Sequence, residues 1–260
     1  MADYTQVRAL LRGLDVLRAL NRHNGGTVLD LVAETGLPRA TVYRLLETLS
    51  TGGYVAKDPT DNRYRLTFQV RTLADGFNDE AWVTYVATPM IEALYHDIVW
   101  PTAVATLAGT SMVVRHSTDQ KSPLAMERSP VGYRVPILTT AVGLAYLAHS
   151  SRQEQHTVLE ALARSDAPAD KLARNPTAVE RLLSEIRSRG YATRFRGVNP
   201  KTSSIAVPVL RQGLSLASIN ITWIDSALTL GDVIERYLPA LRRTARAIEE
   251  RLEAPGEPAA

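Results

Sequence analysis

The chain has 260 residues, of which 45% are hydrophobic and 22% charged, and its net charge is +3. This length predicts two domains, and the composition is typical of a soluble globular protein. The sequence has no cysteine and no run of eighteen apolar residues, and acidic and basic residues interrupt its first twenty positions. Disulfides and thiolate zinc sites are therefore excluded, no membrane span or signal peptide is expected, and the prediction is a cytoplasmic protein.

The charge distribution gives weak evidence for a nucleic-acid partner. Residues 1–78 contain 10 basic and 8 acidic side chains, which leaves 20 and 19 of the totals of 30 and 27 for residues 79–260. Neither half resembles a polybasic tail. A DNA-binding protein of this composition must use a few placed cations, multiplied by oligomerisation.

Residues 5–67 predict three helices followed by a hairpin. Leucines at three- and four-residue steps predict a helix over 5–22. Thr27, with Asp30 three residues later, predicts the capped start of a short second helix that stops at Gly36. A third helix begins near Pro38. Its inner stripe consists of Val42, Leu45, Leu46 and Leu49. Two short strand-like runs then flank the turn-forming segment "DPTDN".

The rest of the chain predicts a linker helix over 68–80 and a second domain over 81–253. The expected helices of this domain are 81–97, the apolar segment "AVGLAYLAHS", 152–164, 176–189 and 229–253. The expected strands form one hairpin that turns at Gly109 and a second pair, "SSIAVPVL" and "LSLASINITWI". Residues 254–260 are expected to be a disordered tail.

The outer face of the third helix is the first candidate site. Opposite the inner stripe it carries arginine, small and aromatic side chains, which suits a helix that enters the major groove of DNA. The cations of the hairpin suit phosphate contact. The candidate DNA-binding residues are Arg39, Ala40, Thr41, Tyr43, Arg44, Lys57, Arg63 and Arg65. Two alternatives stay open, a solvated face on a small helical module and a winged module that binds protein.

The segment "TVLDLVAETGLPRATVYRLLETLSTGGYVAKDPTDNRYRL" resembles the winged helix-turn-helix of the IclR family of bacterial transcription regulators. The likeness continues through "PILTTAVGLAYLA" and "SSIAVPVLRQGLSLASINITW", and so covers nearly the whole chain. The segment "RTLADGFNDEAWVTYVATPMIEALYHDIVWPT" is similar to the branch that activates catabolism of 3-(3-hydroxyphenyl)propionate and related aromatic acids. The resemblance implies an α+β protein in which a linker helix joins the DNA-binding domain to a GAF-like antiparallel-sheet domain that binds a small organic acid.

The resemblance also implies an effector site in the second domain. Backbone amides at Ala141 and Val142 match the family's carboxylate-binding loop, although Val142 narrows access where Gly or Ala is common. Ser204 matches a family cysteine, and Asn220 and Thr222 match two serines when a one-residue gap is allowed. Arg194 falls near a family acidic residue, where it pairs with a carboxylate ligand or is an exposed surface arginine. Leu124 and Met126 are an apolar wall for an aromatic ring or ordinary core.

One observation that bears on the effector site does not depend on the family resemblance. In "LSLASINITW" the side chains Ser218, Asn220 and Thr222 alternate with Ala217, Ile219, Ile221 and Trp223. The polar set lines a pocket or, alternatively, forms the solvated face of a one-sided sheet.

An enzyme with a helical N-terminal module is the competing functional class. The sequence has no nucleophile elbow, phosphate-binding loop or dinucleotide fingerprint, and its histidines lack a recognised metal spacing. Asp119, Glu127 and Asp225 are lone carboxylates in turn-like contexts. We therefore expect no enzyme, no cofactor and no membrane partner. The expected partners are double-stranded DNA with a palindromic operator, a small organic acid, and further copies of the chain in a homodimer or tetramer.

Overall fold

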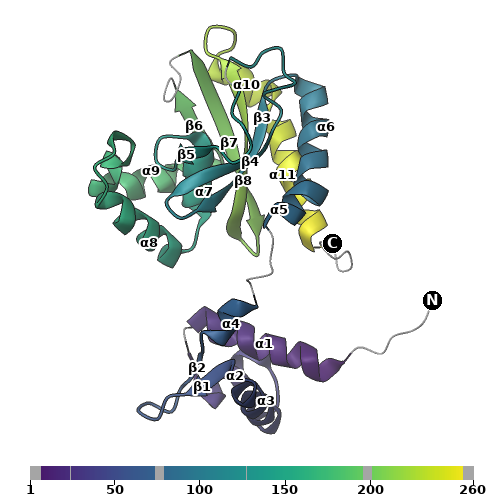
Figure 1. Ribbon diagram of the computed structural model, residues 1–260, viewed down its shortest axis with the longest axis vertical. Coiled ribbons are helices and arrows are strands. Elements are labelled where there is room, and N and C mark those ends of the chain that lie inside the picture. The colour runs from purple at the N-terminus through teal and green to yellow at the C-terminus, as the bar shows by residue number, and fades with distance from the viewer. Residues whose placement is uncertain (1–6, 24, 74–78, 127, 196–200, 254–260) are drawn as a thin grey trace, which may run out of the picture. The chain divides into compact units, whose positions relative to one another are not determined.

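The computed structural model describes residues 7–23, 25–73, 79–126, 128–195 and 201–253. The chain divides into two compact units, Met1–Asn78 and Asp79–Ala260 (Figure 1). The predicted tail over 254–260 and part of the predicted linker helix lie outside the described residues. None of the described helices is both long and apolar enough to cross a membrane.

The first unit is the predicted arrangement of three helices and a hairpin. Its helices are α1 (Arg8–His23), α2 (Val28–Thr35), α3 (Arg39–Thr51) and the short α4 (Gln69–Thr72), and its antiparallel strands are β1 (Val55–Lys57) and β2 (Tyr64–Leu66). The core of this unit is formed by Val16, Ala19, Leu20, Val28, Leu31, Val42, Leu46, Val55 and Tyr64. The first half of the stripe on α1 is not part of this core, because Leu10 and Leu14 remain 63% and 38% exposed.

The turn between α1 and α3 forms as its local sequence predicts. The Thr27 hydroxyl accepts the amide of Asp30, and the Asp30 carboxylate accepts the amide of Thr27 at 2.9 Å, which is a reciprocal capping box. Gly36 ends α2 with φ of 66°, a left-handed conformation that favours glycine. Pro38 occupies the N-cap of α3, one position before the first helical turn in which the sequence placed it.

The second unit is built on a six-stranded antiparallel sheet with the order β5-β4-β3-β8-β7-β6. Its strands are β3 (Thr102–Ala108), β4 (Ser111–Ser117), β5 (Arg134–Pro136), β6 (Ala192–Phe195), β7 (Thr202–Arg211) and β8 (Leu214–Ile224). Both predicted hairpins are confirmed, and Gln212 and Gly213 turn the second with positive φ at both positions. The edge strands β5 and β6 were not predicted, since a run of three or four residues is too short to show alternation.

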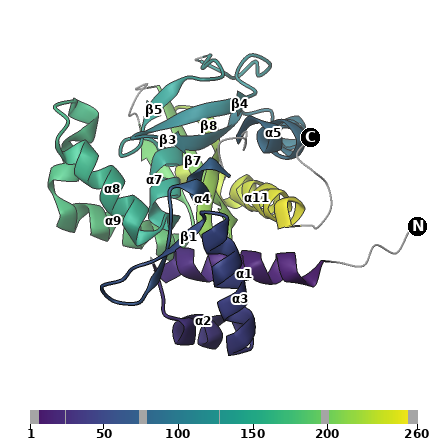
Figure 2. The ribbon, with the colours of Figure 1, turned by 60° about the horizontal axis from the view of Figure 1, so that its bottom comes forward.

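Helices cover both faces of this sheet (Figures 1 and 2). One face packs against α6 (Thr88–Ile98) and α11 (Leu238–Glu253), and the other packs against α7 (Ala141–His149), with α8 (Arg152–Ala163) and α9 (Pro176–Arg189) beyond it. The alternation of β8 divides the faces as predicted, because Ile219, Ile221 and Trp223 belong to the core on the α6 and α11 side. Ser218 on the opposite face is fully buried, so that face is not solvated.

Two predicted helices are interrupted in the structure, and one helical segment was not predicted. The expected helix over 81–97 consists of α5 (Asp79–Trp82), a π-helical segment η1 (Val83–Ala87) and α6. The expected helix over 229–253 is interrupted between α10 (Leu230–Arg236) and α11. Pro239 explains the interruption because it has no amide hydrogen and cannot extend the hydrogen bonding of α10. A 3₁₀ helix, η2 (Pro168–Arg174), was not predicted.

Candidate functional site

The outer face of α3 presents the predicted side chains to solvent. Arg39, Ala40, Tyr43 and Arg44 are exposed and Thr41 is half-buried, while the opposite face of the helix is anchored in the core of the unit. The Arg39 guanidinium lies over the Tyr43 ring at 5.8 Å. The exposed face therefore combines hydrogen-bond donors with apolar groups in the first turns of α3, a helix that is held in place by its buried side chains.

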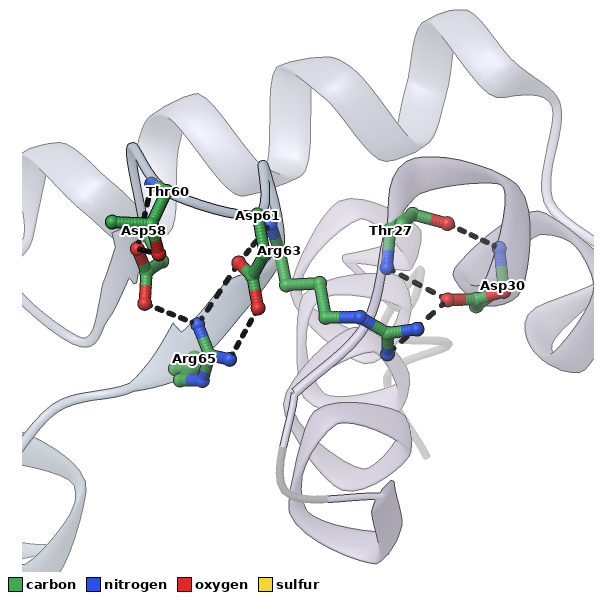
Figure 3. Close-up of polar contacts among 7 residues, drawn as sticks. All are labelled: Thr27, Asp30, Asp58, Thr60, Asp61, Arg63 and Arg65. Carbon is green, nitrogen blue, oxygen red and sulfur yellow. Dashed lines mark hydrogen bonds and ion pairs between the residues drawn. The ribbon is translucent and has the colours of Figure 1, made fainter.

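The three cationic side chains of the hairpin differ in whether they bind carboxylates of the same unit, and Figure 3 shows Arg63 and Arg65. The Arg65 guanidinium donates to the carboxylates of Asp58 and Asp61, at 2.6 Å each. Arg63 lies 3.8 Å from the Asp30 carboxylate, which is a long and exposed ion pair. The Lys57 ammonium is exposed and lies 5.9 Å from the Tyr64 ring centre. Lys57 is thus presented for an anionic partner, whereas Arg65 already binds two carboxylates of its own hairpin.

The carboxylates of the hairpin are held in the ionised form. Hydrogen bonds from Thr60 are the main cause of a lowered pKa at Asp58, and the hydrogen bond from Arg65 is the main cause of a lowered pKa at Asp61. A phosphate would have to compete with both carboxylates for the same donors. Arg65 consequently fits a role in shaping the hairpin better than the predicted contact with DNA.

The second unit contains a cavity of about 120 Å³ at the N-terminal end of α7. One water needs roughly 10–15 Å³ of such space, so the cavity can hold a small organic molecule. The loop between β4 and β5 borders the cavity together with residues of β3, β6, β7 and β8. Every residue that the family resemblance implied for the effector site lines this cavity: Leu124, Met126, Ala141, Val142, Arg194, Ser204, Asn220 and Thr222.

Polar side chains meet in register on one side of the cavity. Arg194 on β6 lies opposite Ser204 on β7, and Ser204 lies opposite Thr222 on β8. The Arg194 Nε donates to the Ser204 Oγ at 3.2 Å, and the Asn220 Nδ2 donates to the Thr222 Oγ1 at 3.0 Å. Of the two readings open for Arg194, the structure supports the half-buried cavity residue over the surface arginine.

The start of α7 adds a second electropositive element. The Thr140 hydroxyl caps the helix by accepting the Gly143 amide, and it donates to the Pro136 carbonyl at 2.6 Å. Ala141 and Val142 follow as the first helical residues, whose amides have no acceptor within the helix. These amides and the helix dipole favour an anion at this end of the cavity.

The loop between β4 and β5 contributes cavity residues that were not expected in the effector site from the sequence. Asp119, Ser129 and Tyr133 line the cavity from the loop between β4 and β5. The Asp119 Oδ2 accepts the Ser129 amide at 3.1 Å, which ties the two parts of this loop together. The only signal in the sequence was an acidic residue, Asp119, two positions after a predicted strand, and such residues are common in turns.

No grouping of three or more histidine or acidic side chains that could hold a metal ion occurs among the described residues. The His116 Nε2 donates to the Glu92 carboxylate at 2.9 Å, and the Lys121 ammonium donates to the same carboxylate at 2.7 Å. His149 is half-buried, and its Nδ1 forms a hydrogen bond with the Ala145 carbonyl at 3.1 Å.

Comparison with known proteins defines the class to which this fold and cavity belong. Residues 9–59 match the IclR helix-turn-helix domain, and residues 79–250 match the C-terminal domain of bacterial IclR transcriptional regulators. The chain therefore belongs to the IclR family, whose members are transcriptional regulators with a DNA-binding domain and an effector-binding domain.

Individual relatives cover almost all of the chain. The Pca regulon regulatory protein of Pseudomonas putida is 26% identical over 92% of this chain and 81% of its own length. The regulator KdgR of Escherichia coli is 25% identical over 95% of this chain and 93% of its own. The crystal structure of an IclR homologue from Microbacterium hydrocarbonoxydans, complexed with 4-hydroxybenzoate, has a TM-score of 0.54 at 22% identity and covers 94% of this chain and 98% of the other.

Proposed function

We propose that this regulator binds a palindromic operator as a homo-oligomer and that an aromatic carboxylic acid bound in the cavity controls its action. One observation carries the ligand class. The effector residues expected from the family resemblance come from separate segments of the chain, and they border a single cavity whose lining combines an arginine and a helix start with apolar side chains. Arginine binds carboxylates with good geometry, and the apolar wall suits a ring.

Each proposed function is assigned to one of the domains expected from the sequence. Residues 1–67 bind DNA, residues 68–80 link the domains and residues 81–253 bind the effector. The proposed effector ligands are the amides of Ala141 and Val142 and the side chains of Arg194, Ser204, Asn220 and Thr222. Leu124 and Met126 contact the ring.

Arg44 is proposed to read a base, because it is exposed on the outer face of α3. Arg44→Ala should then cost about 1–3 kcal/mol of operator binding and relax specificity at one position in each half-site. Lys57→Ala should weaken binding to all sequences and reduce the salt slope by about one. Fluorescence anisotropy with the operator and with scrambled DNA separates the two roles. Unchanged operator affinity in the Arg44 variant refutes base reading.

A homodimer is proposed through the exposed apolar side of α1. Leu10 and Leu14 lie beside a groove formed by α1 and α3, and Leu73 also lines this groove. A second copy of the chain is the proposed occupant, since a palindromic site requires paired recognition helices about 34 Å apart. The variant Leu10→Glu, Leu14→Glu should be monomeric in sedimentation velocity. Leu29→Glu is the matched control because Leu29 is 64% exposed on α2.

The carboxylate site is tested by calorimetry on the full chain. 3-Phenylpropionate should bind, whereas its neutral amide should bind far more weakly, because the amide leaves the donors of the cavity unpaired. Equal affinity for the acid and the amide refutes the site. The double variant Asn220→Leu, Thr222→Val should also lose binding, and full-strength binding would place the ligand elsewhere.

Activation of an aromatic catabolic operon is the proposed outcome. It rests on the sequence likeness to the 3-(3-hydroxyphenyl)propionate branch, and the Pca regulon regulator is among the relatives. An effector changes transcription only if it binds the active and inactive states differently. In vitro transcription with and without the acid tests this, and repression by the acid would refute activation.

A further inference from the structure

The effector cavity has a second charged side chain opposite its electropositive end. Asp119 lines the cavity and follows the end of β4. In the strand order of the sheet, β4 lies toward one edge and β6, which carries Arg194, forms the other edge. Its carboxylate has no part in the ligand set proposed above. The lining of the cavity therefore includes a guanidinium from β6 and a carboxylate from the loop after β4, two strands that lie toward opposite ends of the strand order.

The separation of these ends follows from the strand pairing. Ser204 lies opposite Thr222, whose amide donates to the Pro101 carbonyl at 2.9 Å. The Thr118 amide in turn donates to the Thr102 carbonyl at 2.9 Å, directly before Asp119. Together with the pairing of Arg194 and Ser204, this makes four strand spacings of about 4.8 Å, which place the backbones of Arg194 and Asp119 roughly 19 Å apart. Side chains at both ends shorten this span to the length of a substituted aromatic acid.

The chemistry of Asp119 restricts what the far end can accept. A carboxylate has about four lone-pair sites, so accepting the Ser129 amide does not by itself prevent Asp119 from accepting another donor. A ligand hydroxyl can donate to such an oxygen in a charge-assisted hydrogen bond, which is stronger than a neutral one. A second ligand carboxylate would instead place two like charges together in a half-enclosed site.

We propose that Asp119 determines specificity by accepting a hydrogen bond from a donor group, such as a ring hydroxyl, at the end of the effector opposite its carboxylate. This proposal rests on the carboxylate site of the proposed function. It excludes aromatic dicarboxylates as effectors, and it fixes the orientation of the ligand, because a reversed ligand places its carboxylate against Asp119.

Calorimetry on the full chain with four matched acids tests the proposal. The acids are 3-phenylpropionate and its ring-3 derivatives with hydroxyl, methoxy and carboxylate groups. The hydroxyl compound should bind at least about tenfold more tightly than the parent acid, as expected for a charge-assisted bond. The methoxy and carboxylate compounds should bind more weakly than the parent. The methoxy oxygen places an acceptor without a hydrogen against the Asp119 carboxylate, and the ring carboxylate is repelled by it.

The variant Asp119→Asn keeps an oxygen for the Ser129 amide but removes the charge. The preference for hydroxyl over parent should fall to about threefold or less, and the dicarboxylate should gain at least about tenfold relative to the parent. Asp225→Asn is the matched control, since Asp225 is a half-buried carboxylate that accepts the Ser203 hydroxyl at 2.7 Å and does not line the cavity. It should leave the ranking of the acids unchanged.

The outcomes separate the two proposals. If the parent acid binds and its amide does not, while the parent and hydroxyl compounds bind equally to the unmodified protein, the role of Asp119 is refuted and the carboxylate site stands. If Asp119→Asn weakens all the acids by one common factor, the residue only supports the loop and the specificity role is refuted. If none of the acids binds, both proposals fail.

Discussion

Gly143 is a position at which a single methyl group should displace the start of α7, which borders the proposed effector cavity. It lies in the first turn of α7, two residues after Ala141, and its amide donates to the capping hydroxyl of Thr140. A Cβ at this position would lie 2.2 Å from the Ile137 carbonyl oxygen and 2.4 Å from the Ile137 Cα. Both neighbours are backbone atoms, so they cannot move aside by rotating a side chain.

The magnitude of the effect follows from two opposing contributions. Replacing a helical glycine by alanine normally stabilises a helix by about 1 kcal/mol. Here the Cβ would be more than roughly 1 Å closer than the ordinary separation of about 3.5 Å between non-bonded carbons. Overpacking of a core costs about 1–3 kcal/mol, and a clash with fixed backbone belongs at or above the upper limit. The net expectation for Gly143→Ala is a loss of about 2 kcal/mol.

Thermal and urea unfolding of the full chain measure this loss. A domain of 150–250 residues loses about 2–4 °C of melting temperature for each kcal/mol, so Gly143→Ala should melt about 4–8 °C lower. Effector affinity should fall as well, because relief of the clash moves the start of α7.

Gly231→Ala is the matched control in the same unit. Its Cβ would meet only the Thr229 Oγ1 at 3.6 Å, an ordinary contact, so stability should be unchanged or slightly higher. A melting temperature of Gly143→Ala equal to or above that of the unmodified protein would refute the close approach of α7 to the Ile137 backbone.

Three further perturbations test the charges described above. Arg65→Gln should leave the salt slope of operator binding unchanged because its donors are bound to Asp58 and Asp61, and a decrease of about one would show that it contacts phosphate. Burial, with a smaller contribution from Arg187, lowers the pKa of His149 below its ordinary 6.5, so the unfolded chain binds the proton more readily. Stability should therefore fall as the pH drops below about 6.5, and urea titrations should show a shallower fall for His149→Asn. At Glu92, burial raises the pKa, but hydrogen bonds from Lys121 and His116 outweigh burial and leave it lowered. Glu92→Gln should cost about 1–2 kcal/mol at pH 7 by chemical denaturation, and the difference should shrink as the pH falls below about 4.5, whereas a pH-independent difference would refute the ionic contribution.

The amino-acid sequence determined the features that depend on neighbouring residues. Thr27 and Asp30 cap α2, Gly36 ends it, and Gln212 and Gly213 turn the last hairpin, because each of these choices is made within a few residues. The alternation along β8 likewise assigned Asn220 and Thr222 to one face, since side chains alternate with a period of two in any strand. Family resemblance then supplied the effector residues that local patterns could not connect.

Only the tertiary structure decided which of these groups meet. Arg194 and Ser204 become neighbours because β6 pairs with β7. The strand β6 is a short edge strand that no sequence pattern revealed. Asp119 enters the same cavity because β4 ends across the sheet from β6. Whether a cation is presented to solvent or bound to its own fold is likewise a matter of three-dimensional distance, as Arg65 shows by binding two carboxylates of its hairpin. Pair contacts between distant segments carry no period along the chain, so local propensity cannot encode them.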